Sequence, residues 1–285
     1  VSIPADDTLV ITLPQIKMQK GYDYYVNFSG EGSWNQYALS DVSEWSIPQP
    51  TKMAKVDFVV HPQTGMIEQY RVNGVDYLTD TFGIVPNYWR APIDNDYGNG
   101  SPAKWQVWKV YGKQNMPTQV QEQTLDGQRV ITVTYSLPDI GCQNVITYTV
   151  APNGVLTVDA QMSASTMAEA PRYGVRWRMP KHFASIRYYG RGPWENYCDR
   201  KDAANMGIYA GRVEDMYVPY VRPQENGHRV DTRWLDIMSD NGHGLVVCAV
   251  NNAFEFNALH NSVEDFDSEE SNAPYQWNNF VENDP

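Results

Sequence analysis

Alternation of apolar and polar side chains is the feature that most constrains the fold of this chain. Apolar residues occupy every second position of residues 156–162, with polar residues between them, and residues 146–150 have the same period. A period of two places the two sets of side chains on opposite faces of a β-strand. Asn153 and Gly154 lie between the two runs, and this dipeptide is typical of a tight hairpin turn. The segment therefore predicts two antiparallel strands joined by a turn.

The same period recurs elsewhere in the chain. Residues 131–137 and 175–179 alternate in the same way, and residues 245–250 are continuously apolar. A continuously apolar run of this length predicts a strand that is buried on both faces. Helical periodicity is weak, so we expect helical turns only at about residues 102–108 and 201–204. The sequence thus predicts an all-β protein that contains a large antiparallel β-sandwich.

A division of the chain is expected near residues 45–55. Residues 47–52 contain two prolines, which favour an extended linker. Two alternating apolar runs precede this linker, namely Leu9, Ile11 and Leu13, then Tyr24, Val26 and Phe28. We therefore expect two domains, a partial sheet over residues 1–49 and a sandwich of more than a dozen strands over residues 50–285.

Charge and composition exclude several classes of function. The formal net charge is −12 and basic residues form no run, so no nucleic-acid partner is expected, because such binding needs clustered Lys and Arg. No apolar stretch approaches the roughly 20 residues of a membrane span, so no membrane partner is expected either. Localisation stays open between cytoplasm and periplasm. Cys142, Cys198 and Cys248 are odd in number and far apart, which predicts thiols and not a disulfide framework.

Three segments combine rigid, polar and aromatic residues, as functional loops on a scaffold do. They are Trp-Arg-Ala-Pro-Ile-Asp-Asn-Asp-Tyr-Gly at residues 89–98, Gly-Arg-Gly-Pro-Trp-Glu-Asn-Tyr-Cys-Asp-Arg at 190–200, and Tyr-Val-Pro-Tyr-Val-Arg-Pro-Gln-Glu-Asn-Gly-His-Arg at 217–229. In the first segment Pro92 fixes one backbone dihedral, and the following Asp-Asn-Asp run can cap its own backbone. We therefore expect this segment to be an ordered loop.

Together, the three motifs resemble the C-terminal small-chain domain of bacterial β-galactosidases of glycoside hydrolase family 2. The resemblance runs from about residue 55 to the end of the chain. It implies a galactose-mutarotase-like supersandwich for residues 50–285 and part of an immunoglobulin-like β-sandwich for residues 1–49. A complete immunoglobulin-like domain needs about seven strands, so the resemblance implies that the chain is a fragment.

The resemblance also implies that this chain carries no catalytic residue. Retaining glycosidases use two carboxyl groups, and in this family both belong to a TIM barrel of about 250 residues that precedes the β domains. The implied function is therefore that of a hydrolase fragment that is inactive alone. The parent enzyme would hydrolyse terminal β-D-galactosides such as lactose, and this part would contribute an active-site loop and an assembly surface. The β-galactoside, Mg²⁺, a monovalent cation and homo-oligomer contacts would belong to that parent.

The resemblance places a mobile loop of the galactose pocket just after the Asp-Asn-Asp run. The substrate-proximal residues would be Asp94, Asn95, Asp96, Tyr97, Gly98, Asn99, Gly100 and Ser101. Two glycines supply the backbone freedom of a moving loop, so we expect an exposed and weakly restrained segment. Asp94 and Asp96 also suggest an acid and base pair, in which repulsion would raise one pKa. Turn capping explains the same two residues, and we favour it.

The other two motifs contain side chains suited to hydrogen bonds with sugar hydroxyls. These candidate sugar-facing residues are Glu195, Asn196, Asp199, Arg200, Glu225, Asn226, His228 and Arg229. Carboxylate, amide and guanidinium groups in one place are typical of polar ligand sites. The alternative, which we favour, is that Arg200 and Arg229 pair with nearby acids and fix long loops.

No histidines or cysteines have the spacing of metal ligands, so no metal site is predicted. Asp265, Asp267 and Glu269 vaguely suggest a calcium loop, but the twelve-residue signature is missing, so we expect an acidic turn. The resemblance implies that a structural monovalent cation would be held by the carbonyls of Arg222, Pro223, Phe266 and Glu269.

An alternative function stays open, that of a stand-alone carbohydrate-binding or aldose-epimerase-like protein. An epimerase would need a His base paired with a carboxylate in one groove.

Overall fold

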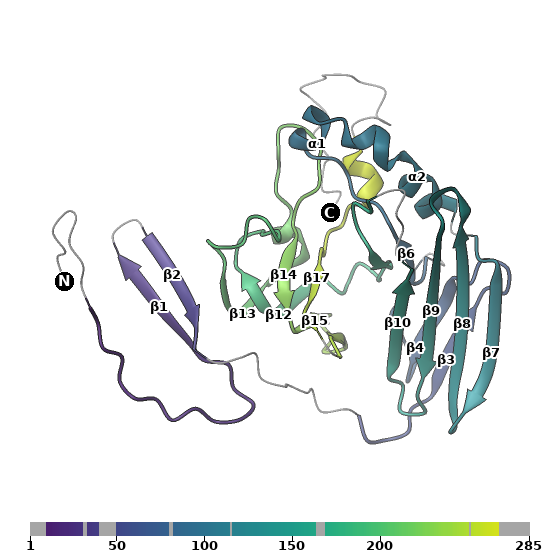
Figure 1. Ribbon diagram of the computed structural model, residues 1–285. Coiled ribbons are helices and arrows are strands. Elements are labelled where there is room, and N and C mark those ends of the chain that lie inside the picture. The colour runs from purple at the N-terminus through teal and green to yellow at the C-terminus, as the bar shows by residue number, and fades with distance from the viewer. Residues whose placement is uncertain are drawn as a thin grey trace. The chain divides into compact units, whose positions relative to one another are not determined.

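The computed structural model describes residues 10–30, 33–39, 50–79, 82–114, 116–163, 169–250 and 252–267. The chain divides into two compact units, Val1–Ile47 and Pro48–Pro285. This division falls inside the linker expected from the sequence, and each unit is described by itself below (Figure 1).

The described part of the first unit contains one antiparallel hairpin. Its strands are β1 (Tyr25–Gly30) and β2 (Ser33–Ala38). The strand expected at residues 24–28 is confirmed as β1, which begins one residue later and ends two residues later. The strand expected at residues 9–13 is wrong for residues 10–13, which carry no regular structure, and Leu9 lies outside the described residues. Val10 is 84% exposed, and residues 10–13 pair with no strand among the described residues. Alternation alone forms no strand unless a neighbouring backbone supplies hydrogen bonds. The immunoglobulin-like identity of this unit stays a prediction.

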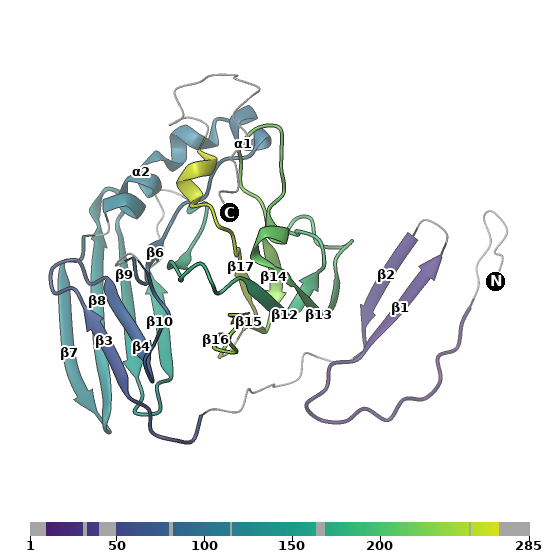
Figure 2. The same cartoon turned by 180° about the vertical axis from the view of Figure 1, so that it is seen from behind.

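The second unit begins with a sandwich of two antiparallel sheets. Its three-stranded sheet contains β3 (Val56–Val60), β4 (Ile67–Val72) and β5 (Val75–Asp76). The facing sheet has the order β10-β9-β8-β7 and contains β7 (Gln119–Leu125), β8 (Gln128–Leu137), β9 (Cys142–Val150) and β10 (Leu156–Met162). Figure 2 shows the two sheets packed face to face. The predicted hairpin is confirmed, since β9 and β10 pair through a turn in which Gly154 has φ +88°.

The core of this sandwich follows the predicted alternation. Ile131, Val133 and Tyr135 point inward from β8, and Ile146 and Tyr148 point inward from β9. Phe58, Ile67 and Tyr70 meet them from the opposite sheet. Burial of one such side chain stabilises the fold by roughly 1.5–3 kcal/mol. The period of two therefore fixes both the strands and the face that each one buries.

A second group of strands completes this unit. One sheet has the order β13-β12-β15-β16 and contains β12 (Ser185–Gly192), β13 (Asn205–Arg212), β15 (Trp234–Met238) and β16 (Gly244–Cys248). Two further pairs are β14 (Arg229–Thr232) with β17 (Phe254–Phe256), and β6 (Val85–Asn87) with β11 (Gly174–Arg176). Tyr77 packs against Tyr70 of the first core and Phe183 of the second core, at ring-centroid distances of 5.7 Å and 5.6 Å. The described strands thus confirm an all-β fold of antiparallel sheets.

Two strand predictions need correction. Residues 245–250 are not buried on both faces, because β16 is the edge strand of its sheet. Val246 is 46% exposed, and Val250, beyond the end of β16, is 82% exposed. The strand expected over residues 175–179 ends at Arg176, where its pairing with β6 ends. The exposure of these side chains depends on the position of the strand in its sheet, and the apolar composition of a segment does not indicate that position.

The helical turn expected at residues 102–108 is a longer helix. The described helices are α1 (Asp94–Gly98) and α2 (Ser101–Gln114), and the 3₁₀ turns are η1 (Pro138–Ile140), η2 (Val213–Met216) and η3 (Val263–Phe266). Helix α2 lies at one end of the first sandwich, where its Trp108 packs with Tyr88, Leu137 and Ile140 (Figure 1). The predicted turn at 201–204 is present as a hydrogen-bonded turn. Within the described ranges, no helix has the length and apolarity of a membrane span.

Candidate functional site

The structure brings most of the candidate sugar-facing residues into one polar network. The network is built from the loop after β12 (residues 193–200), the loop before β14 (residues 217–228), and residues 255–257 in and after β17. Its hydrogen bonds join seven of the eight candidates, and Asp199 is exposed beside Arg200. The two loops, which are separated by β13 in sequence, therefore form one structural feature.

Glu195 connects the two loops through three donors. One carboxylate oxygen lies 2.6 Å from the Arg200 guanidinium and also accepts a hydrogen bond from the Tyr220 hydroxyl. The other oxygen accepts the backbone N–H of Gly227 at 2.8 Å. The hydrogen bond to Glu195 raises the pKa of Arg200, and burial raises the pKa of Tyr220. Both carboxylate oxygens of Glu195 are therefore engaged by groups of this chain.

Asn196 is the most deeply buried member of the network, with 1% of its surface exposed. Its side-chain amide donates to the carbonyls of Arg191 and Trp194 at 3.1 Å and 2.8 Å. Its side-chain oxygen accepts the backbone N–H of Val230 at 2.9 Å. A buried amide with its donors and acceptor satisfied acts as a cross-link between strand and loop.

Arg229 is also buried, with 3% of its surface exposed. Its guanidinium donates to the Tyr188 hydroxyl at 3.1 Å and to the carbonyls of Gly227, His228 and Pro193 at 3.1, 3.0 and 2.8 Å. These partners are backbone carbonyls and a hydroxyl, and they differ from the acids suggested by the sequence. The planar fork of five N–H donors suits such a buried set of acceptors.

His228 lies between two oxygen acceptors. Its Nδ1 is 2.7 Å from Oδ1 of Asn257, and its Nε2 is 2.8 Å from Oε2 of Glu255. The Asn257 amide nitrogen donates to Glu225 and to the carbonyl of Asn226, at 2.9 Å and 2.7 Å, which fixes its oxygen toward the imidazole. Since a carboxylate and an amide oxygen only accept, the geometry is satisfied when both ring nitrogens donate.

The surroundings of His228 complete this arrangement. Tyr197 stacks on the imidazole with ring centroids 5.0 Å apart, and its hydroxyl has no hydrogen-bond partner among the described residues. Burial raises the pKa of Tyr197. The hydrogen bond from His228 lowers the pKa of Glu255. Arg172 pairs with Glu225 at 2.7 Å, so this carboxylate is engaged as well.

The segment expected to be a mobile loop is helical at both ends. Residues 94–98 form α1, and Asp96 is buried, with an ion pair to Arg90 at 2.7 Å. Asp96 also accepts the backbone N–H of Ile93 at 2.8 Å, which caps the start of α1. Asp94 is exposed, and its carboxylate lies near the Arg222 guanidinium. The two carboxylates thus differ in surroundings, and the geometry of Asp96 is that of a cap.

Gly98 ends α1, and residues 99–100 form the exposed connection to α2. Asn99 accepts hydrogen bonds from the backbone N–H of Ser101, at 3.1 Å, and from its hydroxyl. Gly100 has φ +75°, whereas Gly98 does not lie in the left-handed region. Ser101 and Pro102 are buried in the first turn of α2. The glycine that the backbone conformation requires is therefore Gly100, and the expected weak restraint does not extend to the two ends of the segment.

Arg222 joins α1 to the second loop of the network. Its guanidinium lies over the Tyr97 ring, 3.6 Å from the ring centroid, and 3.6 Å from the Asp94 carboxylate. Asn95 is exposed on the same helix. This contact connects the predicted substrate-proximal segment with the predicted sugar-facing loops, which the sequence alone could not show.

Asp265 and Asp267, which suggested a calcium loop, have structural partners. Of the residues whose carbonyls would hold a monovalent cation, Arg222, Pro223 and Phe266 are described and Glu269 is not, so this cation site stays a prediction. Asp265 caps η3 by accepting the backbone N–H of Ser262 at 2.7 Å. Asp267 is buried against Lys109 of α2. Among the described residues, no cluster of three or more His, Cys, Asp or Glu side chains is arranged for a metal ion.

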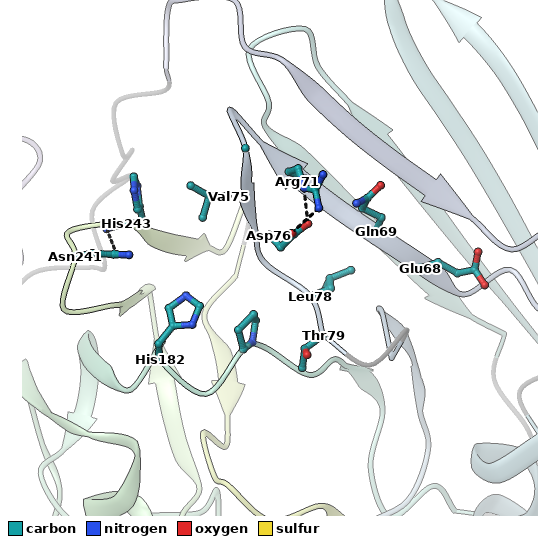
Figure 3. Close-up of a pocket in the computed structure, with 12 residues that line it drawn as sticks. Glu68, Gln69, Arg71, Val75, Asp76, Leu78, Thr79, His182, Asn241 and His243 are labelled. Carbon is teal, nitrogen blue, oxygen red and sulfur yellow. Dashed lines mark hydrogen bonds and ion pairs between the residues drawn. The ribbon is translucent and has the colours of Figure 1, made fainter.

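A separate open pocket was missed by sequence reasoning. It lies between the β3-β4-β5 sheet, the loop before β12 and the turn between β15 and β16 (Figure 3). Its polar lining residues are Glu68, Gln69, Arg71, Asp76, Thr79, His182, Asn241 and His243. None of them belongs to the three motifs, and they come from segments far apart in the sequence. No sequence signal identifies such a pocket, because only the fold brings its walls together.

Comparison with known proteins gives matches to β-galactosidases, both by family and by individual relative. The profile of the family described as "Beta galactosidase small chain" matches residues 52–280. The chain is 35% identical over 178 residues to a β-galactosidase of Priestia megaterium, covering 62% of this chain and 17% of that protein. It is 31% identical over 256 residues to a β-galactosidase of Streptococcus thermophilus, covering 85% of this chain and 24% of that protein. The chain therefore spans about a quarter or less of the length of these relatives.

Proposed function

The chain belongs to the β-galactosidase small-chain family, and on this basis we propose that it is the C-terminal, non-catalytic portion of a β-galactosidase. The whole enzyme would hydrolyse terminal β-D-galactosides such as lactose. In this proposal the catalytic carboxylates, the Mg²⁺ site and most of the galactoside pocket belong to a TIM barrel outside this chain. The monovalent cation and the homo-oligomer contacts also belong to the whole enzyme.

The observation that carries the proposal is that the carboxylates of the polar network are engaged by groups of their own chain. A retaining glycosidase needs two carboxyl groups about 5 to 5.5 Å apart that face the substrate. Glu195 and Glu225 instead face arginines and amides of their own chain. Groups used in this way hold loops rigidly in place, and a rigid loop is what an active-site wall requires. We propose that α1 and the two network loops present such a wall, with Arg222 joining them.

The alternative of an aldose-epimerase-like protein rests on His228 and Glu255. These side chains form the kind of His and carboxylate pair that an epimerase would use, at 2.8 Å. Both imidazole nitrogens, however, already face oxygen acceptors, and the ring is covered by Tyr197. A general base needs a nitrogen lone pair within reach of the substrate proton. The geometry of His228 therefore supports a structural role over the epimerase alternative.

Two activity measurements test the proposal. The purified chain should not hydrolyse a chromogenic β-galactoside, whereas the full-length parent should. The chain should also leave the mutarotation of α-D-galactose, followed by polarimetry, at its uncatalysed rate. Hydrolysis by the chain at a rate near that of the parent would refute the fragment proposal. Mutarotation that the chain accelerates, and that His228→Ala abolishes, would establish the alternative instead.

A further inference from the structure

The open pocket has the size and position of a ligand site. Its volume is about 660 Å³, within the range of roughly 300–1,000 Å³ found for small-molecule pockets. It lies where the wall of the first sandwich meets loops of the second group of strands. Figure 3 shows His182 and His243 on one side of it and Arg71, Asp76 and Gln69 on the other. Side chains from both parts of the second unit therefore converge on one hollow.

Several polar groups in this pocket are not used by the protein itself. Arg71 donates from Nε and Nη2 to Asp76, both at 2.8 Å, and its Nη1 makes no hydrogen bond within the part of the chain that the structure describes. The half-buried Glu68 carboxylate and the imidazole nitrogens of the exposed His182 and His243 also make no hydrogen bond among the described residues, so they face the solvent that fills this open pocket. Donors and acceptors are thus available to a ligand from both sides.

The walls of the pocket are held in place. The hydrogen bonds to Asp76 fix the Arg71 guanidinium, and they lower the pKa of the Asp76 carboxyl. The His182 ring packs on Phe183 with centroids 4.5 Å apart. The turn that carries His243 is closed by the Ser239 hydroxyl, which donates to the His243 carbonyl at 2.8 Å. A pocket formed before binding loses less entropy when a ligand enters.

The charges of the lining indicate the chemical class of the ligand. One guanidinium is accompanied by two carboxylates, two imidazoles and two amides, a mixture that does not favour an anion. The carboxylates and imidazoles form no metal cluster among the described residues. A neutral molecule with many hydroxyls matches this lining best, because each hydroxyl both donates and accepts hydrogen bonds. We propose that this pocket binds a neutral saccharide. The proposal goes beyond the function given above, since it requires neither turnover nor the catalytic barrel.

The experiment is calorimetric titration of the whole chain with galactose and with lactose. The double variant His182→Ala/His243→Ala removes two unused hydrogen-bonding groups and should weaken binding by at least about tenfold. The matched control is Lys181→Ala/Asp240→Ala. Both residues are exposed, and each is the neighbour in sequence of a lining residue, His182 or Asn241, without lining the pocket itself. This control should retain the affinity of the unmodified chain within about twofold. Equal thermal midpoints of the two variants would show that both are folded.

Three outcomes would overturn the proposal. The first is the absence of saturable binding of either sugar up to the solubility limit of lactose. The second is equal loss of affinity in the histidine variant and in the control. The third is binding of galacturonate or inorganic phosphate without binding of the neutral sugars, which would assign the pocket to anions. The hydrolysis assay of the preceding section is unaffected by these results, so the two proposals fail separately.

Discussion

The polar network and the open pocket contain the same kinds of side chain but use them differently. Both combine arginine, carboxylates, amides and histidine. In the network these groups bond to one another and to the backbone, whereas in the pocket several of them face a hollow. Arg229 and Arg71 show the contrast, since the first makes four hydrogen bonds while buried and the second leaves Nη1 unused. A motif rich in polar residues can therefore indicate a rigid scaffold and not the place where a ligand binds.

The largest expected effect is the loss of Arg229. Arg229→Ala leaves the carbonyls of Gly227 and Pro193 and the Tyr188 hydroxyl without this donor, while the His228 carbonyl keeps the backbone N–H of Asn196. We therefore expect a loss of about 3 kcal/mol in the free energy of unfolding. Arg71→Ala is the matched variant in the pocket and should leave the stability nearly unchanged. Urea denaturation measures both. Equal losses for the two arginines would mean that the contrast between network and pocket is wrong.

The next effect concerns a buried amide. Asn196→Ala removes a donor for two carbonyls and an acceptor for Val230, which should lower the free energy of unfolding by about 2 kcal/mol. Asn153→Ala provides a comparison, because this residue bonds its amide in an exposed hairpin turn. The thermal midpoint should fall clearly for Asn196→Ala and less for Asn153→Ala. A larger effect at Asn153 would contradict the assigned role of Asn196.

A smaller effect separates Gly98, the last residue of α1, from Gly100, which lies between α1 and α2. Gly100→Ala places a Cβ on a residue with φ +75°, which should cost about 1 kcal/mol. Gly98→Ala meets no atom within 4 Å and does not require the left-handed region, so its stability should be unchanged or slightly higher. Thermal midpoints of the two variants test this order. In the full-length enzyme, a change in kcat and KM for Gly98→Ala without a change in midpoint would support the predicted moving loop.

The smallest effect is a pH dependence. The hydrogen bond from His228 lowers the pKa of Glu255 in the folded chain, so the carboxylate stabilises the fold at pH values above its unfolded pKa of about 4.3. That contribution is lost as the pH falls through the lower folded pKa. Because the Glu255 side chain is 52% exposed, we expect less than about 1 kcal/mol. Glu255→Gln should flatten this part of the stability profile, measured by urea denaturation in acid. An unchanged profile would refute the contribution.

Local periodicity was sufficient for β8, β9 and β10 of the first sandwich. Residues 131–137 and 146–150 alternate because one face of each strand is buried, and that pattern is visible in the sequence alone. Helix α2 was underestimated because Trp108 is buried by contacts with distant residues, and its apolar face shows no strong period. The place of residues 245–250 at a sheet edge depends on the strand order, which apolarity does not encode.

The candidate site was predictable in part for a similar reason. The motifs identified the loops at residues 190–200 and 217–229, and the fold joins them through Glu195 and Asn196. Whether such side chains face solvent or one another depends on packing between segments that are distant in sequence. The pocket has no motif at all, since Arg71 and His182 are separated by more than one hundred positions. Only the assembled fold reveals it.

The most direct test of the contrast between the two regions is a map of backbone amide shifts in the whole chain as lactose is added. We expect the shifts to concentrate at Thr79, His182 and His243, while the amides of Gly227 and Val230 stay unmoved. Shifts that concentrate at residues 194–200 and 225–229, with the pocket amides unmoved, would contradict this expectation.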